Sequence, residues 1–217
     1  GGGLVSAGGT GIYAAGVIGI EYNFKVPILL SIDYRPEIGV AGGLNGYANG
    51  PYGTVSGGYA GQALGCFSAV GGGYQNRACG FASTVSGGYQ NCASANYSNI
   101  GAGSSNLSSG VRSTISGGHS NTASGACSTI GGGCANTASG AYATIGGGRT
   151  HTVNGAWATV SGGYGNTASG QISFAVGYGN TASGCRSTVT GGQGNISSGG
   201  WSTVGGGLSN TSSGGCS

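Results

Sequence analysis

Acidic residues are almost missing from this chain. Three occur among 217 residues, and all lie near the N-terminus: Glu21, Asp33 and Glu37. Glycosidases and Asp-containing catalytic triads need a positioned carboxylate, so neither kind of site can be built C-terminal of residue 37. Basic residues are also sparse there, and they lie far apart: Arg77, Arg112, Arg149 and Arg186. Because nucleic-acid binding uses clustered lysine and arginine, we expect no nucleic-acid partner.

Groups that could form a metal or nucleophile site are few. The only histidines, His119 and His151, lie about two repeat units apart in different columns of the repeat, and we interpret both as surface substitutions. The chain has seven cysteines but no CxxC motif, so nothing indicates zinc. We interpret the cysteines as small apolar residues, with interchain disulfides left open. We therefore predict no enzymatic activity, no cofactor and no metal.

Glycine, by contrast, occupies 55 positions. No three-residue glycine period runs through the chain, which excludes collagen. Disordered chains usually combine few apolar residues with high net charge. Here 37% of the residues are hydrophobic and the formal net charge is only +3. These values favour a chain that is ordered by a regular repeat.

The repeat has fifteen residues, with the consensus S-T-[VI]-x-G-G-x-x-N-T-A-S-G-x-x. An aliphatic column recurs from Val55 to Val204, and an asparagine and a turn-glycine column keep the same register. One unit, around Phe174, is a residue short. In S-T-[VI]-x, alternation places Ser and Val or Ile on one face and Thr on the other. Asparagines can stack in ladders, and glycines suit corners where φ is positive.

This pattern predicts an all-β fold: a parallel β-solenoid, or β-roll, of about eleven 15-residue coils spanning residues 50–217. At a coil spacing of about 4.8 Å, eleven coils give a rod of roughly 50 Å. Each coil offers little more than one Val or Ile and one Ala or Ser to the interior. The core is thin, so stacking is obligatory. Because the chain opens on Gly1 and closes within a repeat at Ser217, we also expect a fragment or a processed product.

Residues 1–49 do not fit the repeat, and we assign them to a separate N-terminal segment. The runs 12–24 and 28–34 each alternate apolar and other residues, and Lys25-Val26-Pro27 separates them. This predicts a β-hairpin, either capping the solenoid or belonging to a barrel. The string GVIGIEYNF…LSIDYRPEIGV resembles the last strands of some bacterial outer-membrane barrels. The resemblance implies that the solenoid could be an insertion in an extracellular loop of such a barrel.

Aromatic residues recur at two variable positions of the repeat. We predict a partner or interface surface there, formed by Tyr59, Tyr74, Tyr89, Tyr97, Tyr142, Trp157, Tyr164, Tyr178 and Trp201. Spaced aromatics on a rigid face can bind a sugar or a protein, or they can pack against sister chains. Both readings stay open at this point.

The string Ala123-Ser-Gly-Ala-Cys-Ser-Thr-Ile-Gly131 and its copies resemble the A-x-G-x-x-S-x-A-x-G repeat of trimeric autotransporter adhesin heads, which is also seen in phage and viral fibres. The resemblance covers residues 55–217. It implies a homotrimeric β-roll on a cell or virion surface that binds a host surface protein or glycan, with membrane contact only through the parent protein. The fifteen-residue period departs from the usual fourteen of the family.

Two function classes follow. The first is a structural or adhesive extracellular fibre or adhesin head. The second is an ice-binding solenoid, because outward Thr ladders on a flat face of low charge can order water. The outward pairs that this requires are Thr54/Ser56, Thr84/Ser86, Thr114/Ser116, Thr159/Ser161 and Thr188/Thr190.

Overall fold

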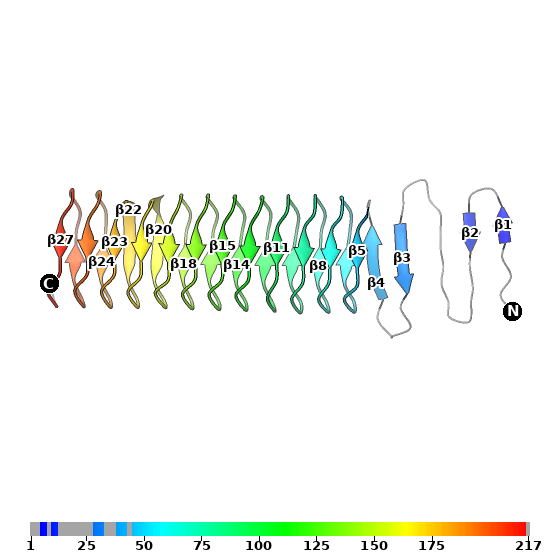
Figure 1. The fold of residues 1–217 in the computed structure, drawn as a ribbon, viewed down its shortest axis with the longest axis horizontal. Helices are drawn as coiled ribbons and strands as arrows, with labels where there is room; N and C mark the ends of the chain where they lie inside the picture. Colours follow the sequence, from blue (N-terminus) through cyan, green and yellow to red (C-terminus); the bar gives the residue numbers. More distant parts are fainter. Residues whose placement is uncertain (1–4, 8–9, 13–27, 33–37, 43–44, 216–217) are drawn as a thin grey trace.

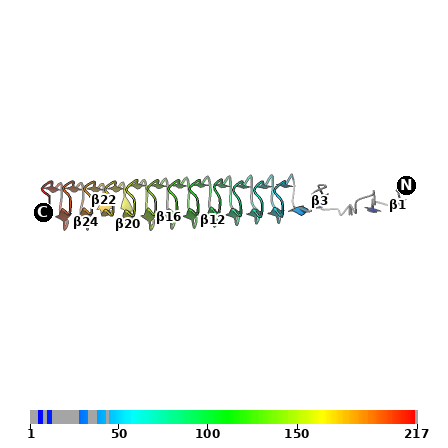
Figure 2. The same ribbon diagram turned by 90° about the horizontal axis from the view of Figure 1, so that it is seen from below.

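The computed structural model describes residues 5–7, 10–12, 28–32, 38–42 and 45–215, and every regular element among them is a β-strand. From β6 (Thr54–Val55) onward, the chain winds into coils that lie side by side in a straight row (Figure 1). Each coil contributes one strand to each of two parallel sheets, which form the two layers seen in Figure 2. The predicted all-β parallel solenoid of eleven coils is confirmed.

We call the larger sheet, of 13 strands, the aliphatic sheet, because it carries the Val and Ile column. Its strands are β3 (Ile28–Ile32), β4 (Ile38–Gly42), β6 (Thr54–Val55), β8 (Ala69–Val70), β10 (Thr84–Val85), β12 (Asn99–Ile100), β14 (Thr114–Ile115), β16 (Thr129–Ile130), β18 (Thr144–Ile145), β20 (Thr159–Tyr164), β22 (Phe174–Tyr178), β24 (Thr188–Val189) and β26 (Thr203–Val204).

The second sheet, of 12 strands, we call the alanine sheet after its main inward residue. Its strands are β5 (Tyr47–Ala48), β7 (Gln62–Ala63), β9 (Arg77–Ala78), β11 (Cys92–Ala93), β13 (Leu107–Ser108), β15 (Thr122–Ala123), β17 (Thr137–Ala138), β19 (Thr152–Val153), β21 (Thr167–Ala168), β23 (Thr181–Ala182), β25 (Ile196–Ser197) and β27 (Thr211–Ser212).

Strands pair in strict register, so each column of the sequence becomes a ladder along the rod. Ile115 lies opposite Ile130, for example, and Ala123 opposite Ala138. The short coil is absorbed by a register shift between β20 and β22, which pair Val160 with Ala175 and then resume the ladder. Side chains from the same position of the repeat therefore meet at every step, and many of these pairs are identical.

The core is one Val or Ile ladder facing one Ala ladder. Ile100, Ile115, Ile130 and Ile145 are fully buried, and so are the inward residues of the facing ladder, which are Ala93, Ser108, Ala123, Ala138 and Val153 in these coils. The buried serine of the consensus closes the turn before it: Ser113 Oγ donates a hydrogen bond to the carbonyl oxygen of Gly110 at 2.7 Å. With so little apolar volume in each coil, hydrogen bonds must supply much of the specificity of the fold.

The asparagine ladder is the main polar element inside the rod. The backbone N–H of Asn121 donates to Asn106 Oδ1 at 3.0 Å, and Asn136 N–H donates to Asn121 Oδ1 at the same distance. Asn121 Nδ2 donates to the carbonyls of Gly117 and Gly133, each at 3.1 Å. The side chain thus links its own coil to the next one, the backbone N–H links it to the preceding one, and Asn121 has no solvent exposure.

Positive φ was predicted for the glycines at both corners of the coil, and the structure shows it at only one of these corners. Gly118, in the Gly-Gly pair, does have a positive φ of 91°. The later turn glycine, Gly125, does not; a Cβ there would lie 2.0 Å from the carbonyl oxygen of Gly140 in the next coil. Close approach of two backbones, not a left-handed φ, therefore selects glycine at this corner. Ala95 fills the position in one coil.

The left-handed conformation instead belongs to residues that are mostly not glycine. In each coil, the residue before the ladder asparagine and the residue two after the turn glycine have φ near +55°, as in Ser120 and Cys127. The ladder asparagines themselves are not among the residues with positive φ.

At the N-terminal end, β3 and β4 form an antiparallel pair that extends the aliphatic sheet. Parallel stacking already includes β4, which pairs with β6, and β5, which pairs with β7, so it begins before residue 50. β1 (Val5–Ala7) and β2 (Thr10–Ile12) form a separate antiparallel pair. Most of the predicted strand 12–24 lies outside the described residues, and so does the pairing predicted for it.

Candidate functional site

The predicted aromatic columns lie along the two edges of the rod, where the chain passes from one sheet to the other. We call the first the tyrosine edge. It runs through bridge-paired positions of successive coils and consists of Tyr59, Tyr74, Tyr89, Ser104, His119, Cys134, Arg149, Tyr164, Tyr178, Gln193 and Leu208. Five of the nine predicted surface residues belong to it.

Tyrosines on this edge stack face to face along the rod. The ring centroids of Tyr59 and Tyr74 are 5.1 Å apart, those of Tyr74 and Tyr89 are 5.0 Å apart, and the planes differ by 10° and 7°. Tyr164 and Tyr178 form a second stack at 5.1 Å. Tyr74 has a neighbouring ring on both faces and is still 39% exposed. The edge therefore presents ring rims and phenol groups to solvent.

The second edge we call the left-handed edge, because each of its positions has a φ between 50° and 62°. It consists of Tyr52, Phe67, Ala82, Tyr97, Arg112, Cys127, Tyr142, Trp157, Ile172, Arg186 and Trp201. The other four predicted surface residues lie here. Tyr142 stacks on Trp157 at 5.5 Å with an interplanar angle of 1°, and the Arg186 guanidinium lies 4.3 Å from the centroid of the Trp201 ring.

Between the edges, the outward faces of both sheets are polar and rich in threonine. The predicted ladder on the aliphatic sheet is present, with Thr114 paired to Thr129 in register. A longer ladder lies on the alanine sheet and was not predicted. It runs without interruption through Thr122, Thr137, Thr152, Thr167 and Thr181. The alternation in N-T-A-S, with Ala inward, was the signal that could have located it.

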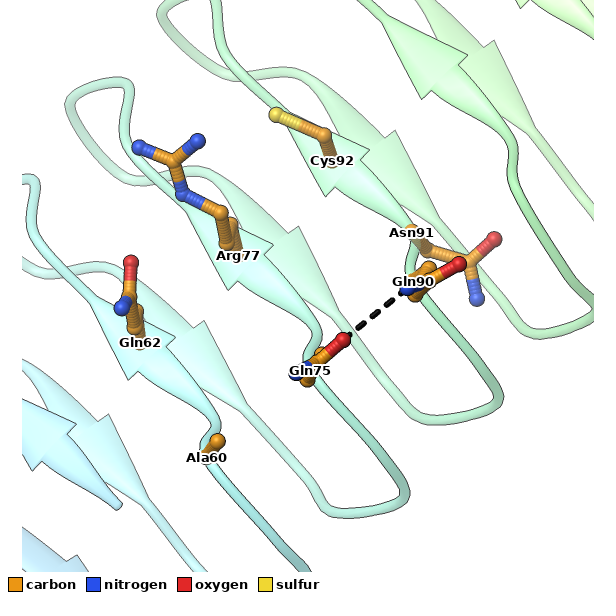
Figure 3. Close-up of a pocket in the computed structure, with 7 residues that line it drawn as sticks. All are labelled: Ala60, Gln62, Gln75, Arg77, Gln90, Asn91 and Cys92. Atoms are coloured by element: carbon orange, nitrogen blue, oxygen red, sulfur yellow. Dashed lines mark hydrogen bonds between the residues drawn. The ribbon is translucent and has the colours of Figure 1, made fainter. Parts of the chain in front are cut away.

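A shallow hollow lies on the alanine sheet beside the tyrosine edge (Figure 3). Gln62, Arg77 and Cys92 form one row across successive strands, and Ala60, Gln75 and Gln90 form the row beside it. Gln90 Nε2 donates to Gln75 Oε1 at 2.9 Å. Burial, and then the nearby Cys79, raise the pKa of the Cys92 thiol, which makes it a weaker nucleophile at neutral pH. The residues lining the hollow include no carboxylate and no imidazole that could serve as its base.

The expectation that both histidines lie on the surface is wrong for His151. It occupies the asparagine position of its coil and is fully buried. Its Nδ1 accepts a hydrogen bond from the Asn166 backbone N–H at 3.0 Å, as an asparagine oxygen would, whereas its Nε2 has no partner. Burial lowers the pKa of His151. His119 is exposed, with Nδ1 2.8 Å from Ser104 Oγ.

Within the described residues, no three side chains of the metal-binding types come together. Of the cysteines in this part of the chain, Cys185 is exposed and the others are partly exposed, and all are free thiols. They point outward or lie at edges instead of filling the apolar core. No helix of the length and hydropathy that a membrane span requires occurs in the described residues.

Comparison with known proteins adds no assignment. No protein-family model matches the chain, and a search of curated proteins returns no match. The function must therefore be argued from the two edges and the two sheet faces.

Proposed function

We propose that this chain is a rod-like structural and adhesive element of an extracellular fibre or surface protein. One observation carries the proposal: large aromatic side chains form stacks of three and two rings on the edge of a straight rod, while about half of their surface stays in water. Monomeric proteins rarely leave aligned apolar surface exposed without a partner. A cell-surface or virion-surface location, which the adhesin-like repeat implies, belongs to the same proposal.

The tyrosine edge suits an extended polar partner. Because the rings cover one another's faces, a sugar ring cannot slide between them to stack. Within each tyrosine stack, the exposed rims and phenol groups offer hydrogen bonds in successive coils, about 4.8 Å apart. A polysaccharide chain or an extended protein segment lying along the rod would meet several of these groups at once. Multiple weak contacts of this kind add up through effective concentration.

Binding of the full chain to immobilised polysaccharides and matrix proteins tests the proposal. We expect saturable binding to at least one class, with a dissociation constant in the micromolar range or below. The same surfaces coated with a globular protein of similar charge serve as the control. If no surface retains the chain above that control, the adhesive part of the proposal fails and only a structural role remains.

A homotrimer, as the family resemblance implies, stays a prediction. In the described coils, the outward faces of both sheets carry mainly Thr, Ser and Gly, and large apolar side chains gather mainly at the edges. A trimer core would therefore have to use an edge. The molar mass of the full chain in solution decides between one, two and three copies.

Ice binding is the second candidate, and the threonine ladder of the alanine sheet favours it. Five coils in a row repeat outward Thr followed two residues later by Ser or Asn, as in Thr137/Ser139. The array is flat, uncharged and regular along the rod. Thermal hysteresis measured with the full chain at millimolar concentration tests this. A freezing-point gap that Thr137→Val and Thr152→Val abolish would support it, and no gap in the wild type would remove it.

A further inference from the structure

The left-handed edge holds large side chains at positions where glycine would cost least. Its eleven residues all have φ between 50° and 62°, a region that costs a residue other than glycine about 1–2 kcal/mol. Glycine makes up 55 of 217 residues, yet it fills none of the eleven positions. The equivalent left-handed row beside the tyrosine edge does include glycines, at Gly165, Gly179 and Gly194.

Packing inside one chain does not account for these side chains. Seven of the large residues, from Tyr52 to Trp201, are 46–59% exposed, and one of them is the β-branched Ile172. Aromatic stacking and cation–π contacts contribute about 0.5–1.5 kcal/mol each, which only balances the backbone strain. A surface that is strained, apolar and half in water indicates an interface.

The charged residues of the left-handed edge indicate in which orientation two copies of the chain could meet there. Two arginines interrupt the aromatics, Arg112 and Arg186, and no carboxylate follows Glu37 in the chain. If two copies met edge to edge in parallel register, each arginine would face its own copy with no acid to neutralise the pair. An antiparallel arrangement avoids that contact.

Antiparallel pairing about Cys127 makes every position complementary. Because the ladder is straight and has one residue for each coil, a twofold axis at Cys127 sets the edge against itself in reverse order. The resulting pairs are Arg112 with Tyr142, Tyr97 with Trp157, Ala82 with Ile172, Phe67 with Arg186, Tyr52 with Trp201, and Cys127 with Cys127. Each arginine meets an aromatic ring, and aliphatic meets aliphatic.

We propose that two copies of this chain associate through the left-handed edge, antiparallel, about a twofold axis at Cys127. Nine large side chains, each leaving about half of roughly 200 Å² exposed, offer on the order of 900 Å² per chain, close to the roughly 800 Å² of a standard interface. The tyrosine edge is less suited, since reversal about Cys134 would set His119 against Arg149. A dimer formed through the left-handed edge leaves the tyrosine edge of each copy exposed. The proposed dimer does not depend on the adhesive function.

The central test is a charge swap followed by the molar mass in solution. Wild type is expected to be a dimer at tens of micromolar. In the Tyr142→Arg variant, the new arginine of each copy would face Arg112 of the other copy. The dissociation constant of the dimer should therefore rise at least tenfold. Arg112 and Arg186 already occupy this edge, so the position accepts arginine. Tyr164→Arg adds the same charge on the tyrosine edge and should leave the dimer unchanged.

The double variant Arg112→Tyr with Tyr142→Arg restores an arginine–tyrosine pair in the antiparallel register, so it should recover the dimer. Failure of this rescue in a protein with a wild-type circular dichroism spectrum would overturn the register. A wild-type monomer or trimer would overturn the proposal altogether. Equal weakening by Tyr164→Arg would move the interface to the other edge.

Chemical cross-linking gives a second measurement that does not depend on tolerance of a new charge. A variant that keeps only Cys127, with its other cysteines replaced by serine, should form a covalent dimer with a short bis-maleimide. The matched variant that keeps only Cys134 should not. Cross-linking of both, or of Cys134 alone, contradicts the proposed axis.

Discussion

Removing one asparagine from the ladder should destabilise the rod far more than its size suggests. In Asn121→Ala, the backbone N–H of Asn136 loses its acceptor, and the carbonyls of Gly117 and Gly133 each lose a donor. An unsatisfied buried polar group costs about 1–3 kcal/mol. The N–H of Asn136 is fully buried and the Gly117 carbonyl is partly buried, while the Gly133 carbonyl still accepts a hydrogen bond from the His119 backbone N–H, so we expect a total loss of about 2–4 kcal/mol.

The loss should be local before it is global. In a stacked solenoid each coil contacts only its neighbours, so stability is approximately a sum of coil and interface terms. Amide hydrogen exchange of Asn121→Ala should therefore show lost protection at Asn136 and in the adjacent coils, while distant coils such as the one around Val70 keep theirs. Urea unfolding gives the total effect.

The matched control is Asn154→Ala, because Asn154 is exposed on the alanine sheet outside the ladder. Its effect should stay within about 0.5 kcal/mol. If Asn121→Ala cost less than about 1 kcal/mol, or no more than the control, the ladder would not be the main polar support of the fold and this reasoning would be refuted.

Three further predictions use the same ladder geometry. Because the pKa of His151 is lowered in the folded chain, the unfolded chain takes up a proton first as pH falls, and the free energy of unfolding should decrease below about pH 6.5. In urea titrations, His151→Asn should remove this part of the pH dependence, and His119→Asn should not. Gly125→Ala should lower the melting temperature, because its Cβ would be forced against the next coil at a cost of about 1–3 kcal/mol. Gly117→Ala is the control and should be neutral, because no atom lies within 3.4 Å of the Cβ that it adds. Burial of Cys92 should slow its alkylation by iodoacetamide near pH 8 at least several-fold relative to the same thiol in urea, and equal rates would contradict the raised pKa.

The sequence predicted the period, the inward Val, Ile and Ala columns and the asparagine ladder, because a ladder repeats one residue type at one spacing. It did not reveal which residues take the left-handed conformation. That conformation usually shows itself as glycine, and here Trp157 and Arg186 hold it instead. The true reason for glycine at Gly125 was also hidden, because it depends on the carbonyl of Gly140 one coil away.

For the candidate surfaces, spacing alone separated the aromatic residues into two columns, but it did not show that these columns lie on opposite edges of the rod. Tyr142 and Tyr164 are both exposed tyrosines, and only the path of the coil places them on opposite edges. The burial of His151 follows from its column, where every other bulky residue is Asn. The threonine ladder through Thr137 was equally visible in the alternation of T-A-S.

Binding by matched edge and face variants tests the central claim most directly: the tyrosine edge of the rod carries its function. The measurement is the affinity of the full chain for whichever extracellular polymer it retains. Tyr59→Ser, Tyr74→Ser and Tyr89→Ser together should weaken binding at least tenfold, and Ser104 shows that this column accepts serine. Thr122→Val, Thr137→Val and Thr152→Val together should leave the affinity unchanged. Loss of binding in the threonine variant, with binding retained in the tyrosine variant, would contradict the account.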